Sequence, residues 1–177
     1  MGDVVVRERR DADLPGCVAA MRSVHETDGY PVVWPAEPER WLTPGGTIGA
    51  WVAEVDGVVA GQALLCRAGA ELAGEVGMPE EELAAVARLF VGAVARKRGA
   101  AGELLARVTE EAQLRGLQPV LEVETRAAKA IALYERTGWQ RVSTRLARWR
   151  RIDGSRAHVH TYVRARPATP ADQGLRG

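Results

Sequence analysis

The chain has little cysteine, few aromatic residues and almost no lysine. Its two cysteines, Cys17 and Cys66, are far apart in 177 residues, and neither lies in a Cys-x-x-Cys motif or near a cluster of histidines. Both are therefore expected to be small buried apolar side chains, which excludes a disulfide framework and a zinc site. Only Lys97 and Lys129 are lysine among 24 basic residues. We attribute the preference for arginine over lysine to coding bias, so the arginine count alone indicates no binding function.

Long hydrophobic runs are also absent. No apolar run approaches the roughly 18 to 20 residues that cross a membrane, and the first residues lack the basic and apolar pattern of a secretion signal. We therefore expect a cytoplasmic protein with no membrane span. Net charge is +1, which argues against a dedicated nucleic-acid-binding protein, because affinity for a polyanion grows with the number of phosphates neutralised.

One segment departs from this even balance of charge. Residues 141–166 hold eight arginines and a single acid, Asp153. The preferred interpretation is a solvated sheet edge. An acidic or phosphorylated substrate, or RNA, is the alternative.

The most informative segment is a turn of small residues between an apolar strand and a helix, LFVGAVARKRGAAGELL at residues 89–105. Because its centre carries almost no side chain, the unpaired N–H groups of the first helical turn can approach an anion there. Three basic residues add positive charge beside it. These small and basic residues are Arg96, Lys97, Arg98, Gly99, Ala100, Ala101 and Gly102. The spacing fits neither the P-loop nor the dinucleotide-binding pattern, so a phosphate loop of another kind is predicted.

A second motif follows about thirty residues later. It has the pattern Leu-Tyr-Glu-x-x-Gly-aromatic, at Leu133, Tyr134, Glu135, Gly138 and Trp139. The earlier turn has the form Arg-x-x-Gly-x-Ala. In this order the two motifs resemble the coenzyme A loop and the next helix of the GNAT superfamily of N-acetyltransferases. The resemblance covers roughly residues 51–163 and implies transfer of an acetyl group from acetyl-CoA to a primary amine.

The fold expected from this resemblance is a single α/β domain of the α+β type over residues 1–166. A mixed, mostly antiparallel sheet of six or seven strands is flanked by helices, in the GNAT-like acyl-CoA N-acyltransferase fold, and residues 167–177 form a flexible tail. Hydrophobic periodicity predicts strands at 4–7, 48–54, 58–67, 85–91, 120–123, 139–149 and 157–163. Helices are predicted between Asp13 and Gly29 and over 37–42, 100–115 and 127–136. Residues 68–82 are predicted to be an acidic loop.

The resemblance also implies roles for individual residues. The pantetheine arm of the cofactor is expected alongside Leu89, Phe90 and Val91, with the Val91 N–H as an oxyanion donor. The pyrophosphate is expected at residues 96–102. Tyr134 is expected to protonate the departing thiolate. The alternative for Tyr134 is an ordinary tyrosine of the core.

Two positions depart from the family pattern. Ala85 stands where some members carry a catalytic glutamate, and Ala127 stands where many carry an asparagine that helps to seat the cofactor. A general base is therefore sought among carboxylates acting through water, with the candidates Glu81, Glu82, Glu122 and Glu124. The same departures motivate an alternative function, a catalytically inactive acyl-CoA-binding or sensor domain.

The resemblance also implies an acceptor site near the aromatic residues Tyr30, Trp34 and Trp41, which precede the second strand. Capping and packing explain the same residues equally well. The acceptor class stays open between a small-molecule amine and a protein amino group, and a homodimer is compatible with the sequence. His158 and His160 share one face of a predicted strand without a carboxylate or cysteine nearby, so no metal site is expected.

Overall fold

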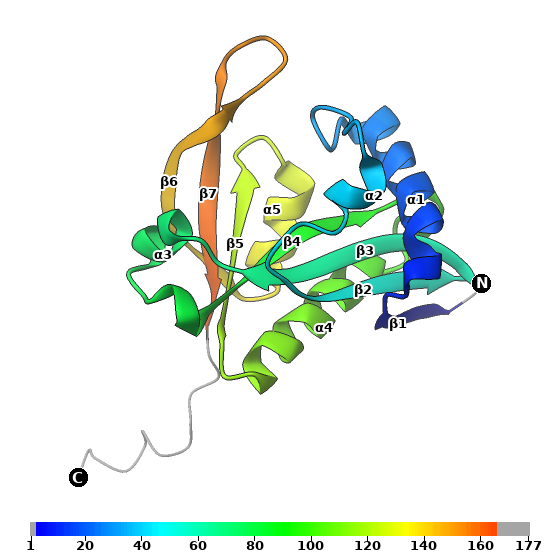
Figure 1. The fold of residues 1–177 in the computed structure, drawn as a ribbon, viewed down its shortest axis with the longest axis horizontal. Coiled ribbons are helices and arrows are strands. Elements are labelled where there is room, and N and C mark those ends of the chain that lie inside the picture. Colours follow the sequence, from blue (N-terminus) through cyan, green and yellow to red (C-terminus); the bar gives the residue numbers. More distant parts are fainter. Residues whose placement is uncertain (1–2, 166–177) are drawn as a thin grey trace.

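The structure is a computed structural model that describes residues 3–165, so the predicted tail at 167–177 lies outside it. A seven-stranded sheet has the order β1-β2-β3-β4-β5-β7-β6, and only its β4–β5 pair is parallel (Figure 1). This confirms the predicted mixed, mostly antiparallel sheet. The strands are β1 (Val4–Glu8), β2 (Thr47–Val55), β3 (Val58–Arg67), β4 (Leu83–Val91), β5 (Gln118–Glu124), β6 (Trp139–Arg150) and β7 (Arg156–Arg164).

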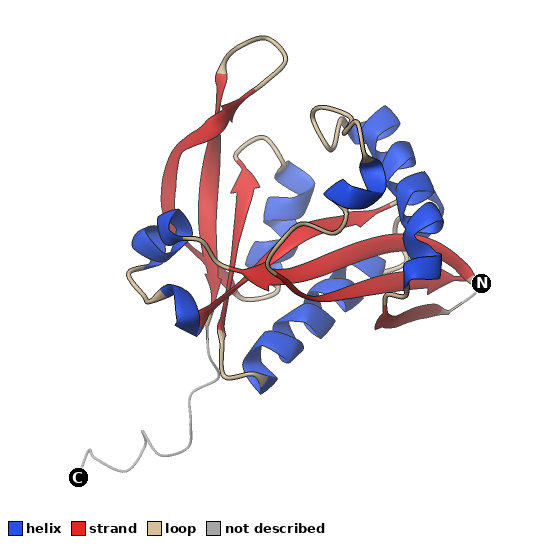
Figure 2. Ribbon diagram, in the orientation of Figure 1, coloured by secondary structure: helices blue, strands red, loops and turns tan. Residues whose placement is uncertain are grey.

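Five α-helices cover the described part of the sheet (Figure 2). They are α1 (Leu14–Asp28), α2 (Pro38–Trp41), α3 (Ala70–Val76), α4 (Ala100–Leu114) and α5 (Ala128–Arg136). The described residues also form three short 3-10 helices, η1 (Asp11–Asp13), η2 (Glu80–Glu82) and η3 (Ala93–Ala95). None of the helices formed by residues 3–165 is long and apolar enough to cross a membrane.

The helices lie in two layers, one on each face of the sheet. Neighbouring residues of β2 show this, because Trp51 and Ala53 join the large core under α4 and α5, whereas Val52 joins a separate core under α1 and α2. Alternation along a strand sends successive side chains to opposite faces. The α3 helix covers the same face as α1 at the other end of the sheet, where Leu72 packs near Val120.

Residues 68–82 were predicted to be a loop, and this prediction is wrong. The segment contains α3, which ends at Gly77 in a left-handed conformation (φ +72°). Only Leu72 and Ala73 of this helix are buried. A helix of only seven residues is too short to show a clear helical period in sequence, and packing against the sheet stabilises it more than propensity does.

The parallel pair β4–β5 is short and then ends. Its register joins Leu83 to Gln118 and Ala85 to Val120, with no pair recorded between the strands beyond these residues. From there β5 pairs only with β7, as at Glu122 and Thr161. One edge of the second half of β4 therefore lacks a strand partner, and the two strands spread apart in Figure 1. Unpaired backbone groups at such an edge can bind a ligand as another strand would.

Candidate active site

A bulge interrupts β4 beside this unpaired edge. Gln62 pairs with Phe90 and Leu64 with Ala87, so Arg88 and Leu89 together oppose a single residue of β3. Arg88 has a left-handed backbone (φ +51°), which is rare for a residue other than glycine. The strands approach closely here, because a Cβ at Gly61 would lie 2.7 Å from the carbonyl oxygen of Phe90. The bulge thus changes the direction of the backbone where β5 has separated from β4.

The register places the Val91 N–H on the open side of β4. The neighbouring Gly92 N–H donates to the carbonyl oxygen of Ala60 at 2.7 Å. Successive N–H groups of an antiparallel strand point to opposite sides, so the N–H of Val91 points away from β3. This is the direction that an oxyanion donor requires, and the assigned role stays a prediction.

The three residues expected along the cofactor have different side-chain environments. Phe90 is 4% exposed and packs in the core under α1 with Met21. Leu89 and Val91 are half-buried against the core under α4. Their side chains are packed into the protein, so any contact with a pantetheine arm falls mainly to the backbone.

The predicted phosphate loop connects β4 to α4 through η3. Two of its residues have left-handed backbone, Lys97 (φ +63°) and Gly99 (φ +81°), and Gly99 is the N-cap of α4. Within residues 3–165, no hydrogen bond is made by the N–H groups of Ala100, Ala101 or Gly102. A Cβ at Gly99 would meet no atom within 4 Å. The start of α4 therefore presents free donors in open space, as an anion site requires.

The basic residues of this loop have separate surroundings. Arg96 donates to Asp28 at 2.7 Å and to Thr27 at 2.5 Å, so it holds the loop to the end of α1. Arg98 lies 3.6 Å from Asp56 in the turn between β2 and β3. Lys97 is exposed and makes no ion pair within the described range. All three add positive charge near the start of α4.

Tyr134 is a buried tyrosine of α5 whose hydroxyl makes no hydrogen bond with the described residues. It is 7% exposed, and its ring lies 6.1 Å from that of Trp139 and 6.0 Å from that of Tyr162. Burial raises its pKa well above that of a free phenol, and the nearby phenol of Tyr30 adds to this shift. Tyr134 therefore stays protonated at neutral pH and has a proton to donate. The predicted acid role is untested.

Two of the three predicted acceptor residues come together. The ring of Tyr30 lies 6.1 Å from that of Trp41 in an edge-on arrangement. Trp34 instead contacts α1, where its ring is 5.4 Å from His25 and 4.5 Å from the guanidinium of Arg22. Tyr30 keeps 36% of its surface exposed, yet its phenol is buried, which raises its pKa.

The candidate carboxylates differ in burial. Glu81 and Glu82 are exposed in η2. Glu122 is half-buried on β5, where it is ion-paired with Arg145. Burial raises the pKa of Glu122, Arg145 opposes that shift, and Glu71 and Glu75 of α3 add to it. Glu124 lies two residues further along the same face and pairs with Arg151 at 2.5 Å. Glu122 and Glu124 are thus both half-buried carboxylates on the strand that separates from β4.

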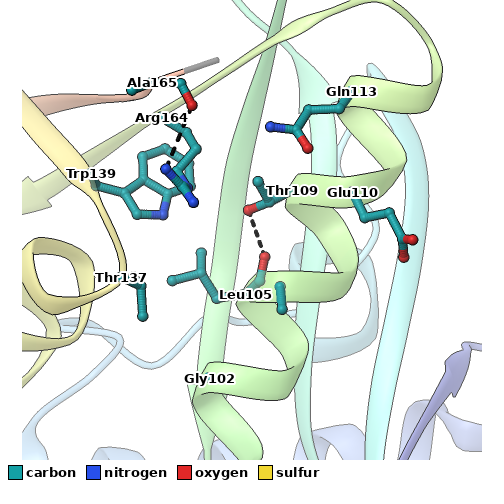
Figure 3. Close-up of a pocket in the computed structure, with 10 residues that line it drawn as sticks. Gly102, Leu105, Thr109, Glu110, Gln113, Thr137, Trp139, Arg164 and Ala165 are labelled. Carbon is teal, nitrogen blue, oxygen red and sulfur yellow. Dashed lines mark hydrogen bonds between the residues drawn. The ribbon is translucent and has the colours of Figure 1, made fainter. Parts of the chain in front are cut away.

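A groove of about 420 Å³ runs along α4 beyond the phosphate loop (Figure 3). The groove extends from Gly102 of α4 to the end of β7. The side chains of Thr109, Gln113, Trp139 and Arg164 surround it. Arg164 donates to the carbonyl oxygen of Gly138 at 3.3 Å. Gly102 is the single predicted cofactor residue in this lining.

Of the two histidines of β7, one has polar partners and the other is exposed. His160 is 2.7 Å from the Thr144 hydroxyl and 3.4 Å from Arg141. His158 is exposed. Within residues 3–165, no three side chains of histidine, cysteine, aspartate or glutamate gather in a way that suits a metal ion.

One residue that sequence reasoning missed is Arg88. An arginine inside an apolar strand looks like a residue of an exposed face, and its type carries no further signal. The bulge and the left-handed backbone that set its direction depend on the register between β3 and β4, which sequence periodicity does not give.

The chain is similar to known acetyltransferases. The sequence pattern of the acetyltransferase (GNAT) family matches residues 18–139, more than half of the chain. The structure of the ribosomal-protein-S18-alanine N-acetyltransferase from Escherichia coli is 19% identical at a TM-score of 0.68 and covers 91% of this chain and 92% of that one. No curated protein sequence gives a significant match.

Two further similar structures contain acetyl-CoA. Arabidopsis thaliana NAA60 in complex with acetyl-CoA is 20% identical, with a TM-score of 0.69 and coverage of 90% and 97% of the two chains. The putative acetyltransferase yncA from Salmonella typhimurium with its cofactor acetyl-CoA is 18% identical, with a TM-score of 0.67 and coverage of 94% and 97%. At these identities the similarity establishes the fold.

Proposed function

The chain belongs to the acetyltransferase (GNAT) family, and we propose that it transfers an acetyl group from acetyl-CoA to a primary amine of a small molecule or a protein. One observation carries this proposal. The unpaired edge of β4, the start of α4 and Tyr134 border the same core, since Leu89 and Val91 pack against the cluster that contains Ala100 and Tyr134. A Cβ at Gly102 of α4 would be 4.0 Å from Leu133, the residue next to Tyr134.

The residues present fit coenzyme A. The N–H groups of Ala100, Ala101 and Gly102 suit a pyrophosphate, since they are free and lie at the positive end of α4. The open edge of β4 at Leu89–Val91 suits the amides of a pantetheine arm. When bound, acetyl-CoA supplies an acetyl group activated as a thioester.

The chain's own groups then have separate tasks. The N–H of Val91 donates a hydrogen bond to the oxygen that gains negative charge. The Tyr134 hydroxyl, which has no partner among the described residues, gives its proton to the departing sulfur. Tyr30 and Trp41 border the place where the amine attacks.

The attacking amine must lose a proton, and we assign this step to Glu122 acting through water. Glu122 is half-buried on β5, whose separation from β4 opens the site, and its pKa is raised by burial. A raised pKa brings a carboxylate closer to neutral pH, where a general base is most effective. Ala85 supplies no carboxylate for this purpose.

Replacing Glu122 with glutamine is expected to lower kcat/KM about a hundredfold, the usual value of a positioned base. A carboxyl group accepts protons only once ionised, so wild-type activity should rise with pH through the raised pKa of Glu122. The part of the pH profile due to Glu122 should vanish in the variant. Initial rates of thiol release across the pH range measure both effects.

Glu124→Gln is the matched control, because Glu124 lies on the same face and also pairs with an arginine. It should keep wild-type activity. Equal losses of kcat/KM in the two variants would indicate that Glu122 only forms a structural ion pair. A Glu122→Gln enzyme with a normal rate but altered stability would indicate the same.

The function itself is tested by thiol release from acetyl-CoA with a broad panel of amines. We expect turnover above background with at least one amine. Tight acetyl-CoA binding without any turnover would favour the alternative, an inactive acyl-CoA-binding or sensor domain. This alternative is motivated by Ala85 and Ala127, which replace the glutamate and the asparagine of the family pattern.

A further inference from the structure

Arg88 occupies an unusual position at the bulge of β4. Its guanidinium stacks on the ring of Trp41, 3.7 Å from the ring centroid, and its Nε donates to the Trp41 carbonyl oxygen at 3.3 Å. The side chain is half-buried. A left-handed backbone in a residue other than glycine costs free energy, and such costs are concentrated at functional sites.

Arg88 has no acidic partner among residues 3–165. Other half-buried arginines do, since Arg7 pairs with Asp13 and Arg151 pairs with Glu124. Arg9 instead donates to three oxygens within 3.1 Å. The Nε donor is hydrogen-bonded to the Trp41 carbonyl oxygen, and the phenol of Tyr30 is a second hydrogen-bond partner of the guanidinium. This leaves further N–H donors of the five without a partner among residues 3–165. A half-buried guanidinium with free donors is set to bind an anion.

The groups around Arg88 are neutral at neutral pH. The phenol of Tyr30 and the thiol of Cys66 are close enough for the positive charge to oppose the rise of their pKa values that burial causes. The uncharged indole ring of Trp41 lies against the guanidinium. The positive charge of Arg88 is therefore not cancelled by its neighbours.

Arg88 also lies next to the reacting groups. It directly precedes Leu89 on the edge of β4, and it is close to the phenol of Tyr30. That phenol is in turn close enough to Tyr134 to raise its pKa. An anion held by Arg88 would thus lie on the acceptor side of the site, near the amine that attacks.

We propose that Arg88 binds a carboxylate of the acceptor, so that the acceptors of this protein are free amino acids or closely similar amines with an adjacent carboxylate. The inference rests on the proposed function. The planar guanidinium matches a carboxylate through two parallel hydrogen bonds, which hold the neighbouring amine in one orientation. An amine without an anion brings only its positive charge, which Arg88 repels. Peptide amino termini lack the adjacent carboxylate and bind weakly.

The test compares matched compounds that differ only at the carboxylate. L-Alanine, L-methionine and L-phenylalanine span three sizes of side chain, and each is paired with its amide and its decarboxylated amine. Calorimetric titration into the complex of the protein with coenzyme A measures binding without turnover, and thiol release from acetyl-CoA measures catalysis. We expect at least one amino acid to bind about tenfold or more tightly than its amide and its amine, the value of a charged hydrogen bond.

The variants Arg88→Gln and Arg88→Lys test whether Arg88 causes this preference for the carboxylate. Glutamine should abolish the preference for the carboxylate, and lysine should keep a part of it, because an ammonium is a point charge without the paired donors. Acetyl-CoA affinity and circular dichroism should match those of wild type. Arg22→Gln is the control, since Arg22 also stacks on a tryptophan, Trp34, but belongs to the outer surface of α1.

Each outcome decides the proposal. Turnover of amides, amines or peptides at rates equal to or above those of the amino acids would overturn it and leave the acetyltransferase function intact. The protein could instead bind carboxylates but acetylate none of the compounds. If Arg88→Gln then removed that binding, the result would support the Arg88 proposal and contradict the proposed acetyltransferase function. A preference for the carboxylate that stays unchanged in both Arg88 variants would also overturn the proposal. So would the lack of any such preference, with every compound and in both assays.

Discussion

Tyr134→Phe is expected to lower kcat about a hundredfold or more while acetyl-CoA affinity stays at the wild-type value. The substitution removes one hydroxyl from a ring that packs between Trp139 and Tyr162 and leaves that packing in place. A positioned acid typically contributes this factor to the rate. The cofactor contacts belong to the backbone of β4 and α4, so they do not change. Steady-state thiol release and calorimetry with acetyl-CoA measure the two quantities.

Stability should separate the catalytic role from a structural one. The Tyr134 hydroxyl makes no hydrogen bond with the described residues, so its removal should leave the free energy of unfolding nearly unchanged. Tyr162→Phe is the matched control. The Tyr162 hydroxyl donates to Glu135 at 3.0 Å, and its loss should cost about 1 kcal/mol of stability with no effect on rate. A normal rate in Tyr134→Phe would show that Tyr134 is an ordinary core residue. The proton donor would then be water or the ammonium group of the acceptor.

Gly99→Glu is expected to abolish detectable acetyl-CoA binding. Gly99 is the N-cap of α4, and a side chain there points into open space, so the protein should still fold. The new carboxylate would lie where the free N–H groups of α4 attract a pyrophosphate, and two negative charges at this distance repel strongly. Calorimetric titration with acetyl-CoA, together with circular dichroism, measures the loss of binding and the integrity of the fold.

Gly99→Gln separates charge from backbone strain. Both substitutions place a residue with a side chain at φ +81°, which costs about 1 kcal/mol, and both add similar bulk. Glutamine carries no charge, so this variant should retain a measurable part of the affinity. Wild-type binding in a folded Gly99→Glu protein would show that the pyrophosphate binds elsewhere.

Local sequence patterns predicted most of the fold because the elements that they describe are stabilised locally. The turn at Asp56 and Gly57, where both residues have positive φ, joins β2 and β3 as its residue types indicate. The phosphate loop is visible in sequence because its function needs small residues at fixed spacing. Gly99 is the N-cap of α4 and has the left-handed backbone that favours glycine.

The parts that sequence did not reveal depend on contacts between distant segments. The α3 helix is stabilised by the packing of Leu72 with Leu83 and Val120, and its seven residues are too few to show a clear helical period. Arg88 acquires its direction from a one-residue mismatch between β3 and β4. The contact between Arg88 and Trp41 joins a strand to the short helix α2 across 47 residues of sequence. Such arrangements follow from packing, which a one-dimensional pattern does not contain.

Calorimetric titration of the wild-type protein with acetyl-CoA tests the central claim most directly, that the open edge of β4 and the start of α4 form an acetyl-CoA site. Saturable binding of one acetyl-CoA per chain is expected, with an increase in the melting temperature, since a ligand that binds only the folded state stabilises it. Neither heat of binding nor a thermal shift at millimolar acetyl-CoA would contradict the account.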